Sequence, residues 1–240
     1  MDTLNILNIM AKILFGGGVA NIRGSIGGTT FSRNTNGAIA RNRTKPVNNN
    51  TFLQQTARAL FGAVAAAWRG LTEPQRQSFF DQAPAYPQTD SLGQTVILSG
   101  QQLFNKLNNS LRQAGEALIS FCLPPVSVPA FTVSSALADI SSPAITVTLG
   151  AVVPAGFKAV IFATPAMSLG KAYLSSEYRQ VGFIAAAASS ADVNSGYIAK
   201  FGSGAANMTV GQNIRIRVEM LSLTTGQRSS GTDFPLTIQA

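Results

Sequence analysis

Histidine is absent from the 240 residues, and cysteine occurs once, at Cys122. The first absence removes the commonest general base and the commonest transition-metal ligand. A single cysteine excludes an intramolecular disulfide, a Cys-rich zinc site and an iron–sulfur cluster held by one chain. Because Cys122 lies between Phe121 and Leu123, we expect a small buried side chain and not a reactive thiol.

Charged residues are scarce, since Asp, Glu, Lys and Arg make up 12% of the chain, about half the usual share. No acidic residue lies between Asp2 and Glu73, whereas eight basic residues do, and they account for most of the net charge of +8. We therefore expect an anionic partner for the first third, either a phosphate backbone or an acidic protein. Aromatic residues are not interleaved with these arginines, which argues against sequence-specific reading of bases.

Long hydrophobic runs are also missing. No window approaches the roughly 20 uninterrupted apolar residues that a membrane span requires. The first 20 residues lack a basic start and include Asp2 and Lys12, so they make a poor signal peptide. We expect a soluble product made in the cytoplasm, with Met1 or Met10 as its first residue.

Local signatures of catalysis are lacking as well. The ten acidic residues stand singly, without the paired carboxylates that acid–base chemistry uses. Ser168 and Lys171 have the spacing of a serine–lysine nucleophile, but they fall in an expected loop without companion motifs. The glycine-rich stretches 16–18 and 24–28 do not end in the Gly-Lys-Ser/Thr of a phosphate loop. The sequence predicts no enzymatic activity, no cofactor and no metal site.

A hairpin is the first structure that the sequence does predict. Asn36-Gly37 is a strong turn signal between two arms, 29–34 and 38–43. An isolated ribbon is marginal in water, so we expect this one to complete itself against another subunit or the following helices, within an extended basic arm over residues 1–50. A solvated face without a partner is the alternative. The candidate assembly or anion-contacting residues are Arg23, Arg33, Arg41, Arg43 and Lys45.

A short helical bundle is expected over residues 51–123. Apolar residues recur every three or four positions from Phe52 to Leu71, which predicts the first helix, capped by Asn50 or Thr51. Thr72 and Ser99 are expected to cap two further helices. Trp68 lies on the apolar stripe, which favours core packing with Arg69 exposed; the alternative is that Trp68 and Arg69 anchor an interface.

Alternation of apolar and polar residues dominates residues 124–240. It predicts about seven short strands separated by Gly, Pro and Ser turns, which is typical of an immunoglobulin-like or fibronectin-like β-sandwich. The whole chain is therefore expected to be α+β, with an arm, a helical bundle and a sandwich. The predicted strands are 130–134, 145–149, 160–162, 180–186, 195–201, 214–220 and 234–238.

Several motifs of the N-terminal half, taken in order, resemble virion structural proteins of tailed bacteriophages and prophages. The similarity covers about residues 10–115 and implies a component of the head, connector or tail. It implies assembly with copies of itself and other virion proteins, and it transfers no activity, cofactor or catalytic residue. The motifs that carry it are 22–34, 37–43, 67–72 with Gln75 and Arg76, 91–93 and 100–104 with Asn108.

The leading hypothesis is accordingly a phage virion protein made in the host cytoplasm. Its basic arm and helices would be embedded in the particle, while the sandwich packs outward as a decoration or binding module. A genome-contacting, packaging-associated protein is the first alternative, because the arm is basic. A carbohydrate-binding adhesin is the second, suggested by the polar Ser, Thr and Gly loops of the sandwich.

Overall fold

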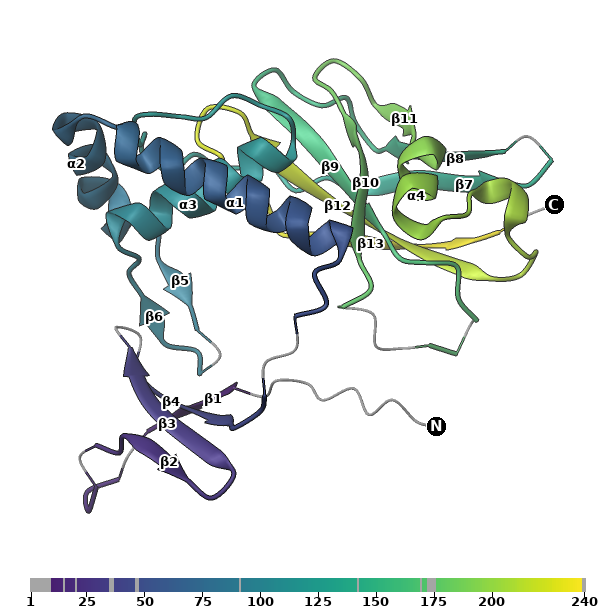
Figure 1. Cartoon of the computed structure of the whole chain (residues 1–240). Coiled ribbons are helices and arrows are strands. Elements are labelled where there is room, and N and C mark those ends of the chain that lie inside the picture. The colour runs from purple at the N-terminus through teal and green to yellow at the C-terminus, as the bar shows by residue number, and fades with distance from the viewer. Residues whose placement is uncertain are drawn as a thin grey trace.

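A computed structural model of the chain describes residues 10–14, 16–19, 21–34, 37–45, 48–90, 92–141, 143–168, 170–171 and 176–238. Their fold is α+β, as the sequence predicts (Figure 1). An N-terminal sheet, a helical region and a pair of facing sheets follow one another along the chain. Within these described ranges, no helix is both long and apolar enough to cross a bilayer.

The N-terminal sheet has antiparallel strands in the order β1-β4-β3-β2. Their bounds are Met10–Ile13 for β1, Gly24–Ile26 for β2, Thr29–Asn34 for β3 and Gly37–Asn42 for β4. The predicted hairpin is present as β3 and β4, with Arg33 opposite Ala38; its turn residue Asn36 lies outside the described residues.

The hairpin belongs to a four-stranded sheet, whereas the sequence predicts a two-stranded ribbon completed by another subunit or by the helices. Strand β1 pairs with β4, and β2 pairs with β3 through a two-residue turn in which Gly27 has a φ of 56°. Glycine adopts this left-handed conformation without the strain that a Cβ would bring. The chain therefore supplies two further strands to a hairpin that would be marginal alone.

Three helices make up most of the helical region: α1 Phe52–Gly70, α2 Glu73–Gln82 and α3 Gly100–Gln113. The 3₁₀ turn η1 (Ala83–Ala85) and a small hairpin of β5 (Gln88–Thr89) and β6 (Thr95–Val96) separate α2 from α3. Each helix begins where the sequence predicts it, and Thr51 rather than Asn50 caps α1. Thr51 Oγ1 accepts from the N–H of Gln54, whose side-chain oxygen accepts from the N–H of Thr51, a reciprocal capping box.

Aromatic side chains form the core of the helical region. Trp68 of α1 packs at ring-centroid distances of 6.0 Å from Phe79 and 5.2 Å from Phe104. Leu103 and Leu107 of α3 complete this cluster and are almost fully buried. The helical region therefore has its own hydrophobic core, which needs no residue of the N-terminal sheet.

The facing sheets contain seven described strands. Strands β10, β9, β12 and β13 form one sheet in that order, and β11, β8 and β7 form the other. Buried side chains from both sheets, among them Ile145, Ile161 and Ile216, share one cluster. We call these strands the sheet pair. Their bounds are β7 Val133–Asp139, β8 Ala144–Leu149, β9 Phe157–Ala163, β10 Arg179–Ile184, β11 Ser190–Asp192, β12 Asn213–Ser222 and β13 Thr232–Thr237.

One predicted strand of the sheet pair is wrong, because residues 195–201 belong to helix α4 (Asn194–Phe201). Tyr197 and Phe201 lie four residues apart on one helical face, with ring centroids 4.6 Å apart, and Tyr197 is buried. Their spacing also fits alternation, which is how a short apolar run can be mistaken for a strand. Strand β11 lies just before this helix, outside the predicted range.

Helix α3 packs against the outer face of the sheet β10-β9-β12-β13 (Figure 1). Leu111 and Ala114 of α3 share a buried cluster with Val160 of β9 and Leu221 of β12. A Cβ at Gly226 would lie 2.6 Å from the carbonyl oxygen of Leu107, so only glycine fits between the β12–β13 connection and the helix. The helical region and the sheet pair therefore meet at a packed seam.

Candidate functional site

The five basic residues predicted as contacts all lie in or beside the N-terminal sheet. Arg33 belongs to β3 and Arg41 to β4, while Arg23 precedes β2 and both Arg43 and Lys45 follow β4. All five are exposed. Within the described part of the chain, none of them forms an ion pair with a carboxylate. Their charges are therefore available to an external partner.

The strand register distributes these charges over both faces of the sheet. Arg33 lies opposite Ala38 and shares its face with Phe31 and Ala40, whereas Arg41 lies opposite Thr30 on the other face. The sequence places the arginines in one region but does not place them on one surface. A partner that contacts a single face would meet only part of the set.

One face of the N-terminal sheet is mainly apolar. Strand register places Ile26, Phe31, Ala38 and Ala40 together on it, with Ile13 of β1 opposite Ala38. Ile26 is 70% exposed, Ile13, Phe31 and Ala40 are half-buried, and Ala38 is buried. A partly exposed apolar face of this kind is a frequent feature of interaction surfaces.

Lys12 connects the N-terminal sheet to the helical region. Its ammonium forms an ion pair with Asp90, which lies between β5 and β6. The hydrogen bond from Lys12, followed by the backbone N–H of Gln94, holds the pKa of Asp90 below its usual range. Sequence reasoning missed this pair, because the two residues lie 78 positions apart and neither stands in a motif.

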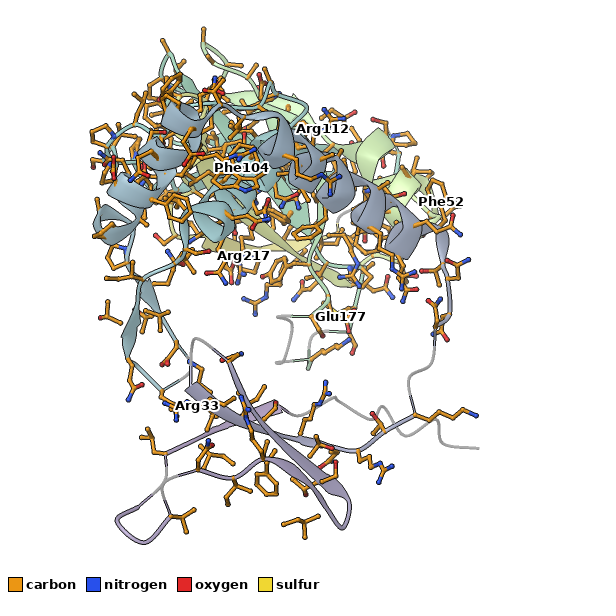
Figure 2. The ribbon with its side chains drawn as sticks, turned by 60° about the vertical axis from the view of Figure 1, so that its left-hand side comes forward. Arg33, Phe52, Phe104, Arg112, Glu177 and Arg217 are labelled. Carbon is orange, nitrogen blue, oxygen red and sulfur yellow. The ribbon has the colours of Figure 1, made fainter. Side chains whose placement is uncertain are left out.

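The first half of α1 extends beyond the helical core. The predicted apolar stripe packs inside the protein from Val64 onward, but its first residue, Leu53, is about half exposed. Outside the stripe, Phe61 is also about half exposed and Phe52 is 78% exposed. Figure 2 shows Phe52 at the start of α1 and Arg33 on the N-terminal sheet. This exposed half contains Arg58 and no acidic residue, so it continues the basic and apolar character of the sheet.

Trp68 lies in the core of the helical region and is 8% exposed, which removes it as a surface anchor. Its rings contact Phe79, Phe80 and Phe104. Arg69, the next residue of α1, is exposed. Of the predicted interface pair, only Arg69 is accessible to a partner.

Two side chains that could serve as nucleophilic groups, Lys171 and Cys122, are held in structural contacts. Lys171 Nζ lies 3.0 Å from a carboxylate oxygen of Glu177, and this ion pair engages the lysine of the serine–lysine spacing. Burial raises the pKa of the Cys122 thiol to about 11, so this side chain stays protonated at neutral pH. Within the described ranges, no three His, Cys, Asp or Glu residues come together as a metal site.

No family model matches the chain when it is compared with known protein families, and no curated protein matches it significantly.

Proposed function

We propose that this protein is a structural component of a phage particle, in its head, connector or tail, that acts through protein–protein assembly. The N-terminal sheet is the assembly element of the proposal. The proposal rests on the five predicted cations, which are exposed and have no carboxylate partner among the described residues, beside a partly exposed apolar face. A protein neighbour with an acidic and apolar surface would satisfy both features, since complementary potentials and apolar burial together stabilise interfaces.

The exposed half of α1 supports the same proposal. Leu53 and Phe61 expose apolar surface on one side of α1, whose stripe is already packed from Val64 onward. Phe52 lies on the side of the helix opposite Phe61. Helices with an open apolar stripe commonly bind in a groove of a partner protein. In the assembled particle, other copies of the chain or other virion proteins would cover these side chains.

We also infer that the sheet pair is a fibronectin-like β-sandwich that packs outward as a decoration or binding module. Its first, second and fifth strands form one sheet, and its fourth, third, sixth and seventh strands form the other in that order. This distribution of strands is that of fibronectin-like relatives of the immunoglobulin fold. Helix α4, between β11 and β12, would be an addition to that plan.

Incorporation into particles tests the assembly proposal. A phage that lacks the gene would be complemented with the full chain, with a chain lacking residues 10–45, or with the double variant Arg41→Glu and Arg43→Glu. We expect both changes to abolish incorporation, measured by immunoblot of purified particles. Lys200→Glu, an exposed charge reversal on α4, is the matched control and should incorporate normally. Normal incorporation of the chain lacking residues 10–45 would reject the N-terminal sheet as the assembly element.

A genome-contacting role is the second candidate, because the same five cations could neutralise phosphates. Neutralising about five phosphates gives a slope of roughly −4 to −5 for the logarithm of affinity against the logarithm of salt concentration. Fluorescence anisotropy with duplex DNA measures this slope. Replacing Arg41 and Arg43 by alanine should reduce its magnitude by about two. The absence of binding at low salt would reject this role and leave the assembly proposal unaffected.

A further inference from the structure

A pocket of about 340 Å³ lies at the seam, between α3, the segment around Tyr86 and the β12–β13 connection. This volume is at the lower end of the range for small-molecule sites. Two basic residues line it, Lys106 of α3 and Arg228 after β12, and its lining includes no acidic residue. Neither basic residue belongs to the basic N-terminal sheet.

Lys106 has no carboxylate partner among the described residues. Its ammonium donates to the side-chain oxygen of Gln88, a neutral amide. The side chain remains accessible to solvent, while partial burial lowers its pKa. An anion that enters the pocket would therefore meet an ammonium whose charge is not yet compensated.

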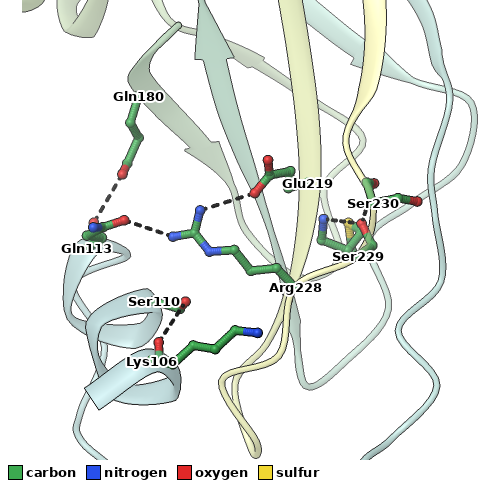
Figure 3. A network of polar contacts seen from close by, with 9 residues as sticks. Lys106, Ser110, Gln113, Gln180, Glu219, Arg228, Ser229 and Ser230 are labelled. Atoms are coloured by element: carbon green, nitrogen blue, oxygen red, sulfur yellow. Dashed lines mark hydrogen bonds and ion pairs between the residues drawn. The ribbon is translucent and has the colours of Figure 1, made fainter. Parts of the chain in front are cut away.

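Arg228 is only partly engaged by its protein neighbours. Nη1 lies 3.2 Å from a carboxylate oxygen of Glu219, and Nη2 lies 3.0 Å from the side-chain oxygen of Gln113 (Figure 3). Its Nε–H is buried and has no acceptor within the described part of the chain. Unpaired buried donors of this kind are costly and uncommon in folded proteins, where a water or a bound ion can satisfy them.

Gln227 adds a neutral donor to the lining. Its side-chain oxygen already accepts from the N–H of Val126 (2.8 Å) and from the hydroxyl of Thr225 (3.2 Å). These bonds fix the orientation of the amide and leave its NH₂ group without an acceptor among the described residues. Ala85 and Pro87 are exposed and provide apolar surface in the same pocket. The lining thus combines several donors with a small apolar wall.

We propose that the seam pocket binds a carboxylate, with its negative charge at Lys106 and its apolar part against Ala85 and Pro87. The charges favour a monoanion, because Lys106 and Arg228 together with Glu219 leave one positive charge. The carboxylate can come from a free organic acid or from a glutamate side chain of another protein. Both sources present the same group to Lys106.

Titration of the full chain with benzoate at constant ionic strength tests the proposal. We expect calorimetry to show saturable binding of benzoate and no binding of benzyl alcohol, which has the same ring without the charge. The variant Lys106→Met should bind benzoate about tenfold more weakly, because it loses one charge-assisted hydrogen bond. Lys200→Met is the matched control and should bind benzoate as the unmodified chain does. Equal binding by the Lys106 variant, equal binding of benzyl alcohol, or no saturable binding of benzoate would overturn the proposal.

Two further measurements make the result decisive. A blocked tripeptide with a central glutamate, titrated in parallel, distinguishes the sources: tighter binding than that of benzoate points to a protein side chain, and weaker binding points to a free acid. If Lys106→Met does not fold, NMR of the unmodified chain replaces it. Benzoate must then shift the Lys106 side-chain signal and leave the Lys200 signal in place; a shift of neither signal, or of both equally, would count against the pocket.

Discussion

At the scale of one residue, Asn108 holds the segment that follows α3 against the helical region. Its side chain is fully buried in α3. The amide nitrogen donates to the carbonyl oxygen of Ile119 (3.2 Å), and the amide oxygen accepts from the N–H of the same residue (2.8 Å). One side chain therefore satisfies both backbone groups of Ile119 and fixes the segment that leads to Cys122.

Replacing Asn108 by alanine should lower the free energy of unfolding by about 2–3 kcal/mol, because the backbone groups of Ile119 would lose their partner. Urea unfolding followed by circular dichroism measures this change. Asn109→Ala is the matched control, since the Asn109 side chain bonds, among the described residues, only to the carbonyl of Asn105, and we expect a change within about 0.5 kcal/mol. Equal losses in the two variants would contradict the role assigned to Asn108.

Asp233 gives the outer face of the sheet pair a dependence on pH. Arg217 Nε and Nη2 lie 2.6 and 2.8 Å from its two carboxylate oxygens, and the guanidinium lies 4.2 Å from the centroid of the Tyr178 ring. The hydrogen bonds from Arg217, the largest cause, hold the pKa of Asp233 below its usual value despite partial burial. A carboxyl whose pKa is lowered on folding adds stability above its unfolded pKa, and this contribution disappears as the pH falls through the folded pKa.

Asp233→Asn should therefore destabilise the protein at neutral pH, and the difference from the unmodified chain should vanish in acid, below the usual aspartate pKa of about 3.9. The pair is partly exposed, so we expect no more than about 1 kcal/mol. Chemical unfolding between neutral and acidic pH measures the difference. Asp81→Asn is the control, because Asp81 accepts from the neutral amide of Gln77. A difference that persists unchanged in acid would refute the ion-pair explanation.

At the scale of elements, the two glycines Gly62 and Gly196 have opposite roles within helices. A Cβ at Gly62, on the exposed side of α1, would meet nothing within 4 Å. A Cβ at Gly196 of α4 would lie 1.7 Å from the carbonyl oxygen of Val181 in β10. Gly62 therefore lowers the helix propensity of α1 without serving a close contact, whereas Gly196 allows α4 to pack on the sheet.

Gly62→Ala should raise the free energy of unfolding by about 0.5–1 kcal/mol. Gly196→Ala should lower it by about 3 kcal/mol, since α4 must move away from β10 to accommodate the methyl group. Thermal and urea unfolding measure the change in the free energy of unfolding for both variants. Each variant is the control for the other, because the two changes have opposite signs. A stable Gly196→Ala variant would show that α4 does not pack as closely as described.

The sequence predicts elements well where their signals are local. All three helices of the helical region begin at predicted caps, because a capping box needs only four consecutive residues. The β3–β4 hairpin follows from its turn in the same way. The sequence does not predict strand β1, because it pairs with β4, 25 to 31 residues later, without a turn signal between them. Helix α4 was mistaken for a strand because eight residues are too few to separate the two periodicities.

At the scale of the whole molecule, the helical region and the sheet pair are joined more closely than either is to the N-terminal sheet. Leu111 and Val160 share a buried cluster across the seam. None of the three buried clusters contains a described residue of the N-terminal sheet. The stability of the rest of the molecule should not depend on that sheet.

Removing residues 1–47 should therefore leave a folded chain whose Tm changes by no more than about 2 °C, a small shift for a domain of this size. Circular dichroism and differential scanning calorimetry measure the transition. Leu111→Ala, which opens a cavity at the seam, is the contrasting variant and should cost about 2–5 kcal/mol. A large loss of Tm on truncation would show that the N-terminal sheet contributes to the core.

The candidate site is predictable only in part, because the signals in a sequence are local. The cations of the N-terminal sheet follow from composition, because eight basic residues stand in an interval without acids. Their division between two faces depends on strand register, which pairs Arg33 with Ala38 and Arg41 with Thr30. The seam pocket brings Lys106 and Arg228 together across more than 120 positions, and no local pattern signals such a contact.

The position of Trp68 also determines how the protein can be observed. The only tryptophan and the only cysteine, Cys122, both belong to the core of the helical region. Tryptophan emission and the rate of thiol labelling therefore report the opening of that region alone, while the sheet pair stays silent to both. The unlabelled protein thus contains an optical reporter, Trp68, and a chemical reporter, Cys122, and both follow the helical region.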